Sequence, residues 1–189
     1  MAAIGACQVL GIDKNIVLKS IESFKPPLGR GNIVYDNSFK VMVDFAHTPN
    51  GIEQILKAVK PQVKGRIIHV FGSAGDRDKY KRPLMGKISS NYSDIIILTA
   101  EDPRKEPLIN IIDEIASGVR EIELKTNKKV LMKILDRQQA INKAVKLAQK
   151  GDLVLITGKG HEKSMNSGKG EVSWSEYKAI EEALEEKNV

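Results

Sequence analysis

Hydrophobic and polar positions repeat along the chain with two periods, one typical of strands and one typical of helices. Short apolar runs predict strands at residues 41–45, 66–71, 94–99, 130–135 and 153–157. Between them, apolar residues recur at helical spacing, as with Ile52, Ile55, Leu56 and Val59. This alternation predicts an α/β fold, a Rossmann-like and mostly parallel sheet with helices on both faces.

Capping residues predict where several helices begin. Thr48 precedes a proline at the start of one helix, and Asp136 precedes a helix that we expect to run through Lys150. Ser173 and Glu176 have the spacing of a capping box, which predicts the start of the last helix.

Two further segments lead to local predictions. The helix expected over residues 108–119 has Ile109, Ile112 and Ala116 on one stripe, which we expect to be buried. The sequence NSGKG at 166–170 is low in complexity, and we expect a mobile loop there.

The first residues form a different kind of segment. Residues 2–24 have the pattern of two short helices, and residues 25–31 (KPPLGRG) have the composition of a linker. Two helices cannot bury their apolar faces alone. We therefore predict that residues 1–31 belong to a preceding domain and its hinge, and that residues 32–189 form the α/β domain.

Charge and cysteine content narrow the classes of partner. The chain has 30 Lys and Arg against 24 Asp and Glu, a formal net charge of +6. This charge would suit nucleic acid, a membrane surface or an anionic small molecule. Basic residues do not cluster with aromatic ones, so a mixed solvated surface is favoured, with no nucleic-acid and no membrane partner. The single cysteine, Cys7, excludes a disulfide framework, fits a cytoplasmic location and is interpreted as a small core residue.

Polar clusters follow four of the predicted strands. They are Asp44-Phe45-Ala46-His47-Thr48, Gly72-Ser73-Ala74-Gly75-Asp76-Arg77-Asp78, Glu101-Asp102-Pro103-Arg104 and Gly158-Lys159-Gly160-His161-Glu162. Each alone has an ordinary structural interpretation, as a turn, a helix start or a surface ion pair. Together, at the carboxyl edge of one sheet, they predict a site of mixed charge for a zwitterionic or phosphorylated ligand. The sequence contains no P-loop motif. GKGHE offers one His and one adjacent Glu, with no cysteine and no second histidine nearby, which does not suit zinc, so no metal ligands are predicted.

These clusters carry a family resemblance. The stretches are LGR at 28–30, VDFAHTPNGIEQIL at 43–56, VFGSAGDRDKYKRPLMG at 70–86, EDPR at 101–104, LDRQQAI at 135–141 and GDLVLITGKGHE at 151–162. The chain resembles Mur ligases, most closely the UDP-N-acetylmuramoyl-tripeptide synthetases that add the third residue of the peptidoglycan stem. The resemblance implies a three-domain, ATP-dependent enzyme. Residues 1–31 would be the last helices of its central domain and the hinge, and residues 32–189 its amino-acid-binding C-terminal domain.

The resemblance also implies cofactors and partners. ATP and Mg²⁺ would be held mainly by the missing central domain. The partners would be UDP-N-acetylmuramoyl-dipeptide, a diamino acid, and the N-terminal and central domains of the same polypeptide.

Roles for individual residues follow from the same resemblance. The nucleotide would be contacted by Arg30, Asp44, His47 and Arg77, with His47 near the phosphates. The incoming amino acid would be bound by Arg82, Asp102, Arg104, Gly158 and Glu162. No residue of this chain is assigned a certain catalytic role.

One motif departs from the family pattern. EDPR stands where meso-diaminopimelate-adding enzymes have DNPR, so Glu101 replaces an Asp and Asp102 replaces an Asn. The retained Arg104 would form a bidentate pair with the distal carboxylate of diaminopimelate. The added acidity would favour a plain ammonium, which leaves a lysine- or ornithine-adding enzyme as an alternative.

The implied function is the ATP-dependent addition of meso-diaminopimelate to UDP-N-acetylmuramoyl-L-Ala-D-Glu. Without a P-loop, residues 1–189 alone would be folded but inactive. The alternatives are another ligase of the superfamily, such as a folylpolyglutamate synthase, a non-catalytic Mur-ligase-like binding module, and a nucleic-acid-binding protein.

Overall fold

The computed structural model describes residues 2–119 and 129–189 and contains one large sheet. Its strands, in spatial order, are β1 (Asn32–Asp36), β2 (Lys40–Asp44), β6 (Leu153–Thr157), β3 (Ile67–Phe71), β4 (Ile95–Leu98) and β5 (Val130–Lys133). β1 is antiparallel to β2, and every other pair in this sheet is parallel. The predicted mostly parallel α/β sheet is therefore confirmed.

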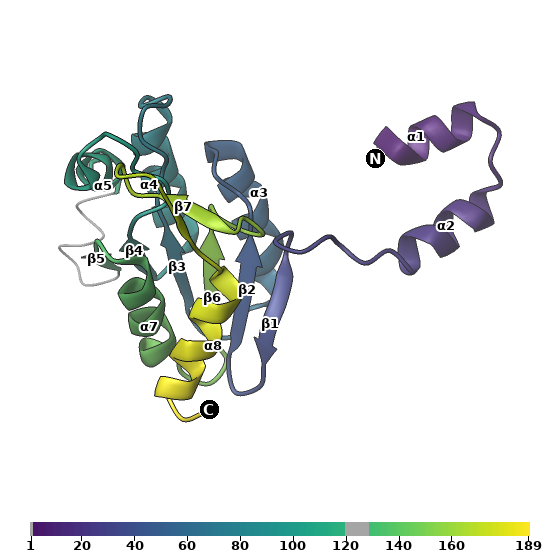
Figure 1. Cartoon of the computed structure of the whole chain (residues 1–189). Coiled ribbons are helices and arrows are strands. Elements are labelled where there is room, and N and C mark those ends of the chain that lie inside the picture. The colour runs from purple at the N-terminus through teal and green to yellow at the C-terminus, as the bar shows by residue number, and fades with distance from the viewer. Residues whose placement is uncertain (1, 120–128) are drawn as a thin grey trace.

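Helices cover both faces of this sheet (Figure 1). One face carries α3 (Pro49–Val59), α4 (Lys81–Tyr92) and α5 (Leu108–Ala116), and the other carries α7 (Arg137–Leu147) and α8 (Glu176–Glu186). The central strands are buried throughout because each contributes side chains to both of the resulting cores.

Two capping predictions are confirmed and one is wrong. The side chain of Thr48 accepts a hydrogen bond from the Gly51 amide, and that of Asp136 accepts one from Gln139, although this helix ends at Leu147. The predicted capping box at Ser173 is wrong, because Ser173 ends a short strand and the N-cap of α8 is Ser175.

The reason lies in the burial of Glu176. This residue is fully buried and forms an ion pair with Arg137, so its carboxylate cannot reach back to cap the helix. Ser175 caps α8 instead, and its side chain accepts a hydrogen bond from the Lys178 amide.

The predicted stripe on α5 is displaced around the helix. Ile111, Ile112 and Ile115 are fully buried, whereas Ile109 is 46% exposed. The close approach of α4 accounts for this, because a Cβ on Gly86 would lie only 2.0 Å from the carbonyl oxygen of Ile115.

The NSGKG segment forms the turn of a hairpin. β7 (Ser164–Asn166) pairs with β8 (Glu171–Ser173) in an antiparallel two-stranded sheet. The sequence predicted a mobile loop here and gave no sign of the two strands, which have three residues each.

The first two helices lie apart from the sheet (Figure 1). Neither α1 (Ala2–Val9) nor α2 (Lys14–Glu22) has a buried residue, and Cys7 is only partly buried. The interpretation of Cys7 as a core residue is therefore not met in this chain. No helix in residues 2–119 and 129–189 has the length and apolarity needed to cross a membrane.

Candidate functional site

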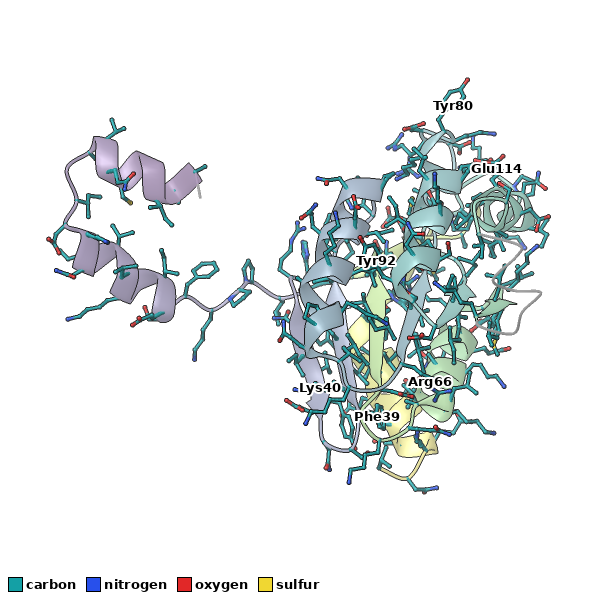
Figure 2. The ribbon with its side chains drawn as sticks, turned by 180° about the vertical axis from the view of Figure 1, so that it is seen from behind. Phe39, Lys40, Arg66, Tyr80, Tyr92 and Glu114 are labelled. Carbon is teal, nitrogen blue, oxygen red and sulfur yellow. The ribbon has the colours of Figure 1, made fainter. Side chains whose placement is uncertain are left out.

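Loops after β2, β3, β4 and β6 meet at one edge of the sheet, because the carboxyl ends of parallel strands lie together. Tyr80, in the loop after β3, projects from this end of the domain, and Phe39 and Arg66 lie at the opposite end (Figure 2). The loops enclose a pocket of about 400 Å³ lined by Phe45, His47, Thr48, Ala74, Arg77, Asp78, Lys81, Glu101, Asp102, Arg104, Gly158 and Glu162. Six of the predicted site residues line it, namely His47, Arg77, Asp102, Arg104, Gly158 and Glu162.

Phe45 forms an aromatic and cationic cluster on one side of the pocket. The guanidinium of Arg30 lies over its ring, 4.4 Å from the ring centre. The rings of His47 and His161 lie 4.8 and 5.3 Å from that of Phe45. The cluster therefore brings the linker, the loop after β2 and the loop after β6 to one place.

Asp44 fixes the linker to the sheet. One carboxylate oxygen accepts a hydrogen bond from the Gly31 amide at 2.8 Å, and the other accepts one from the Ala46 amide at 2.8 Å. Gly29 has φ of +74°, and a Cβ there would lie 2.4 Å from the His161 amide nitrogen. Only glycine allows the linker to pack this closely against the loop after β6.

The cations of the pocket are placed for an anionic ligand. The ammonium of Lys81 donates to the carbonyl oxygen of His47 at 2.9 Å, and Arg77 is exposed at the mouth. His47 itself is oriented by a contact of 2.9 Å between its Nδ1 and the carbonyl oxygen of Phe45. With the Phe45 ring beside them, these groups fit a nucleotide, since they present cations for phosphates and an aromatic face.

Arg82 does not line the pocket. Its guanidinium is fully buried and pairs with both carboxylate oxygens of Glu106 at 2.8 Å and with Glu114 at 2.7 Å. The hydrogen bonds that Glu106 accepts from Arg82, and after them those from Lys79 and the Asp76 amide, lower its pKa to about 2. The role of Arg82 as a ligand for a substrate carboxylate stays a prediction, and in this structure the carboxylate of Glu106 pairs with its guanidinium.

The turn at residues 101–104 is held in a strained shape by the β7–β8 hairpin. Arg104 has φ of +52°, which is uncommon for a residue with a side chain. Its amide donates to the carbonyl oxygen of Asn166 at 3.1 Å, and the amide of Asn166 donates to Asp102 at 2.8 Å. Within the described residues, the Arg104 guanidinium has no ion-pair partner, so its charge remains free for a ligand.

Lys159 lies beneath the pocket between two of its acids. Its ammonium is 3.0 Å from a carboxylate oxygen of Asp102 and 2.5 Å from one of Glu162, and its side chain is 2% exposed. Sequence reasoning placed Lys159 in the motif but gave it no role.

Glu101 is the least compensated acid of the site. It is 6% exposed, and its Oε2 has no hydrogen-bond partner in the described structure. Burial raises the pKa of Glu101, opposed by the charges of Arg137, Lys81 and His47. Its carboxylate lies so close to Gly158 that a Cβ there would approach to 2.7 Å.

A buried pair supports the strand ends from below. Arg137 donates to the carbonyl oxygens of Ala100 at 2.7 Å and Thr157 at 2.9 Å, and it pairs with Glu176. This ties the ends of β4 and β6 to α8. The sequence gave no sign of it, because a charged residue near a helix start is normally solvated. Among the described residues, no three His, Cys, Asp or Glu side chains gather as metal ligands.

The fold and the site together define an α/β domain with a pocket of mixed charge at the carboxyl edge of its sheet. A family model described as "Mur ligase, glutamate ligase domain" matches residues 29–160, and the chain belongs to this family.

Relatives extend the match to nearly the whole chain. A Clostridioides difficile UDP-N-acetylmuramoyl-L-alanyl-D-glutamate–2,6-diaminopimelate ligase is 42% identical over 185 residues, which is 97% of this chain and 37% of the relative. A Borreliella burgdorferi UDP-N-acetylmuramyl-tripeptide synthetase is 42% identical over 184 residues, 97% of this chain and 36% of the relative.

A solved structure agrees with them. It is that of a UDP-N-acetylmuramoyl-L-alanyl-D-glutamate–2,6-diaminopimelate ligase, with a TM-score of 0.78 and 30% identity, covering 100% of this chain and 38% of that one. The chain thus spans less than two fifths of the length of these relatives.

Proposed function

We propose that this chain is the amino-acid-binding part of an ATP-dependent ligase that adds meso-diaminopimelate to UDP-N-acetylmuramoyl-L-alanyl-D-glutamate. The observation that carries the proposal is the guanidinium of Arg104, which has no ion-pair partner in the described part of the chain and lies in one pocket with Asp102 and Glu162. These groups complement the distal carboxylate and ammonium of diaminopimelate. The names of the relatives support the same reaction.

Each side of the pocket has a role in this proposal. Arg104 binds the distal carboxylate, and Glu162, with the close backbone at Gly158, receives the distal ammonium. The other side, formed by Arg30, His47 and Arg77 with Asp44 bracing the linker, contacts the nucleotide.

Catalysis by these residues is positioning and charge neutralisation. ATP, when bound, supplies the phosphoryl group that activates the acceptor carboxylate. This domain then orients the attacking amine and, by rotating on the linker, excludes water. Residues 1–31 would be the end of the central domain and the hinge, and Mg²⁺ would be held outside this chain. The reaction would be cytoplasmic, and residues 1–189 alone would be inactive.

A chimera tests the proposal. Residues 1–189 would replace the segment they match in the C. difficile relative, and ADP release would be measured with each diamino acid. We expect release that depends on meso-diaminopimelate and on the nucleotide dipeptide. Arg104→Met should lower kcat/KM for diaminopimelate by about tenfold to a hundredfold, since a charge-assisted pair is lost.

The unmodified relative is the control for assembly. A folded chimera that releases no ADP with any diamino acid would sink the proposal. Release with lysine or ornithine, but not with diaminopimelate, would favour the alternative suggested by the acidity of Glu101 and Asp102.

A further inference from the structure

The position of Lys159 bears on the choice between diaminopimelate and a plain diamine. Its ammonium bridges Asp102, at 3.0 Å, and Glu162, at 2.5 Å. These are two of the acids that line the pocket. In this structure an internal ammonium therefore already lowers the net negative charge that would attract the ammonium of lysine or ornithine.

The loop after β6 builds this arrangement. Lys159 lies between Gly158, with φ of +111°, and Gly160, with φ of +53°. A Cβ on Gly160 would lie 3.0 Å from the Cβ of Phe45, so the loop is packed closely at both glycines. The amide of Glu162 donates to the carbonyl oxygen of Lys159 at 2.9 Å, which folds Glu162 back over the lysine side chain. The lysine is thus held below the pocket by the backbone.

Formal charges show the consequence. Asp102 and Glu162 carry two negative charges, and Lys159 and Arg104 carry two positive ones, so the four groups are neutral together. The distal end of diaminopimelate is also neutral, because it has one ammonium and one carboxylate. A lysine side chain brings a single positive charge, which would lie beside Lys159 and Arg104 without a compensating carboxylate.

Glu101 does not reverse this balance. It is 6% exposed in the same pocket, and burial raises its pKa, which favours its neutral form. The raised pKa weakens the attraction that Glu101 offers to a cationic side chain.

We propose that Lys159 is a specificity-determining residue, whose ammonium neutralises Asp102 and Glu162 so that the pocket selects a zwitterionic side chain over a cationic one. This inference rests on the proposed function. Lys159 acts through the two acids and is not assigned a contact with the reacting atoms.

Binding by the 189-residue chain tests this inference. The dissociation constants for meso-diaminopimelate and L-lysine would be measured by NMR titration for the wild type, Lys159→Met and Lys159→Arg. The ratio of the lysine constant to the diaminopimelate constant should fall at least tenfold in Lys159→Met, because two carboxylates become unpaired. Lys159→Arg, which keeps the charge, should retain most of the preference. Lys163→Met is the matched control, since Lys163 is exposed outside the pocket, and its ratio should not change.

A second variant should change this ratio in the opposite direction. Glu162→Gln removes one of the negative charges that face the ammonium of the ligand L-lysine. The ratio of the lysine constant to the diaminopimelate constant should therefore rise in this variant. This variant also serves if Lys159→Met does not fold, as judged from amide spectra, because Glu162 is 40% exposed.

The outcomes separate the two proposals. If the wild type binds diaminopimelate and neither variant changes the ratio, the role of Lys159 is overturned and the proposed function stands. If the wild type binds neither diamino acid, the role of Lys159 is overturned, and ADP release by the chimera decides the proposed function separately.

Discussion

Buried polar side chains act as ties between elements under the site. His69, in β3, is fully buried between Ser89 of α4 and Thr157 of β6, with ring-nitrogen contacts of 2.9 and 3.0 Å. Burial, and then the charge of Arg137, lowers the pKa of His69 from 6.5 to about 3. The imidazole is therefore neutral in the folded chain at any pH where the protein would work.

This buried histidine makes stability depend on pH. Below about pH 6.5 the unfolded chain takes up a proton at this residue, whereas the folded chain does so only near pH 3. The free energy of unfolding should therefore fall as the pH drops through this window, by up to about 1.4 kcal/mol per unit. Urea unfolding at pH 7, 6 and 5 measures the slope above the range where carboxylates titrate.

His69→Gln isolates this contribution. It removes the titrating group while it keeps a polar side chain, so its slope between pH 7 and 5 should be smaller than that of the wild type. His47 and His161 are present in both proteins and cancel in the difference. Equal slopes would show that His69 is protonated in the folded chain as easily as in the unfolded one.

At the scale of single elements, the two serines before α8 make a matched pair. Ser175 caps the helix through the Lys178 amide, whereas Ser173 ends β8 and is exposed. Ser175→Ala should lower the free energy of unfolding by about 1 kcal/mol, and Ser173→Ala should change it by less than about 0.5 kcal/mol. Thermal or urea unfolding of both variants measures this, and a larger loss for Ser173→Ala would restore the capping box that the sequence suggested.

The sequence predicted the five parallel strands of the large sheet, but not β1, β7 and β8 or the burial of charged side chains. A run such as DIIILT at 94–99 has a local signal, because an apolar strand covered on both faces differs from any loop. Glu176 and Ile109 were assigned wrongly for a shared reason. Their environment depends on Arg137 and on α4, which come from distant parts of the chain.

The site shows the same division at the scale of the molecule. The sequence correctly predicted that residues after different strands lie close together, because parallel strands bring their carboxyl ends to one edge of the sheet whatever their order. The partners of Arg82 and Lys159 were not foreseen, since pairing with Glu106 or Asp102 depends on how segments distant in the chain are placed relative to each other. Sequence could therefore predict which residues line one pocket, but not which of their charges pair with each other.

The chain as a whole consists of the α/β domain and two helices that add nothing to its core. α1 and α2 have no buried residue. The segment 2–24 that contains them exposes large apolar side chains, with Val9 88%, Leu10 75% and Phe24 66% accessible. Between the helices lies an apolar hollow of about 620 Å³, remote from the site. Contiguous apolar surface of this kind promotes association.

Removing residues 1–27 should therefore leave the α/β domain intact and reduce self-association. The shortened chain keeps Gly29, Gly31 and Asp44, whose contacts close the linker onto the sheet. Its free energy of unfolding should match that of the full chain within about 0.5 kcal/mol, because no buried contact is lost. Urea unfolding measures this, and light scattering at matched concentrations should give a lower apparent mass. A marked loss of stability would mean that α1 and α2 pack on the domain in solution, and that the first 27 residues belong to it.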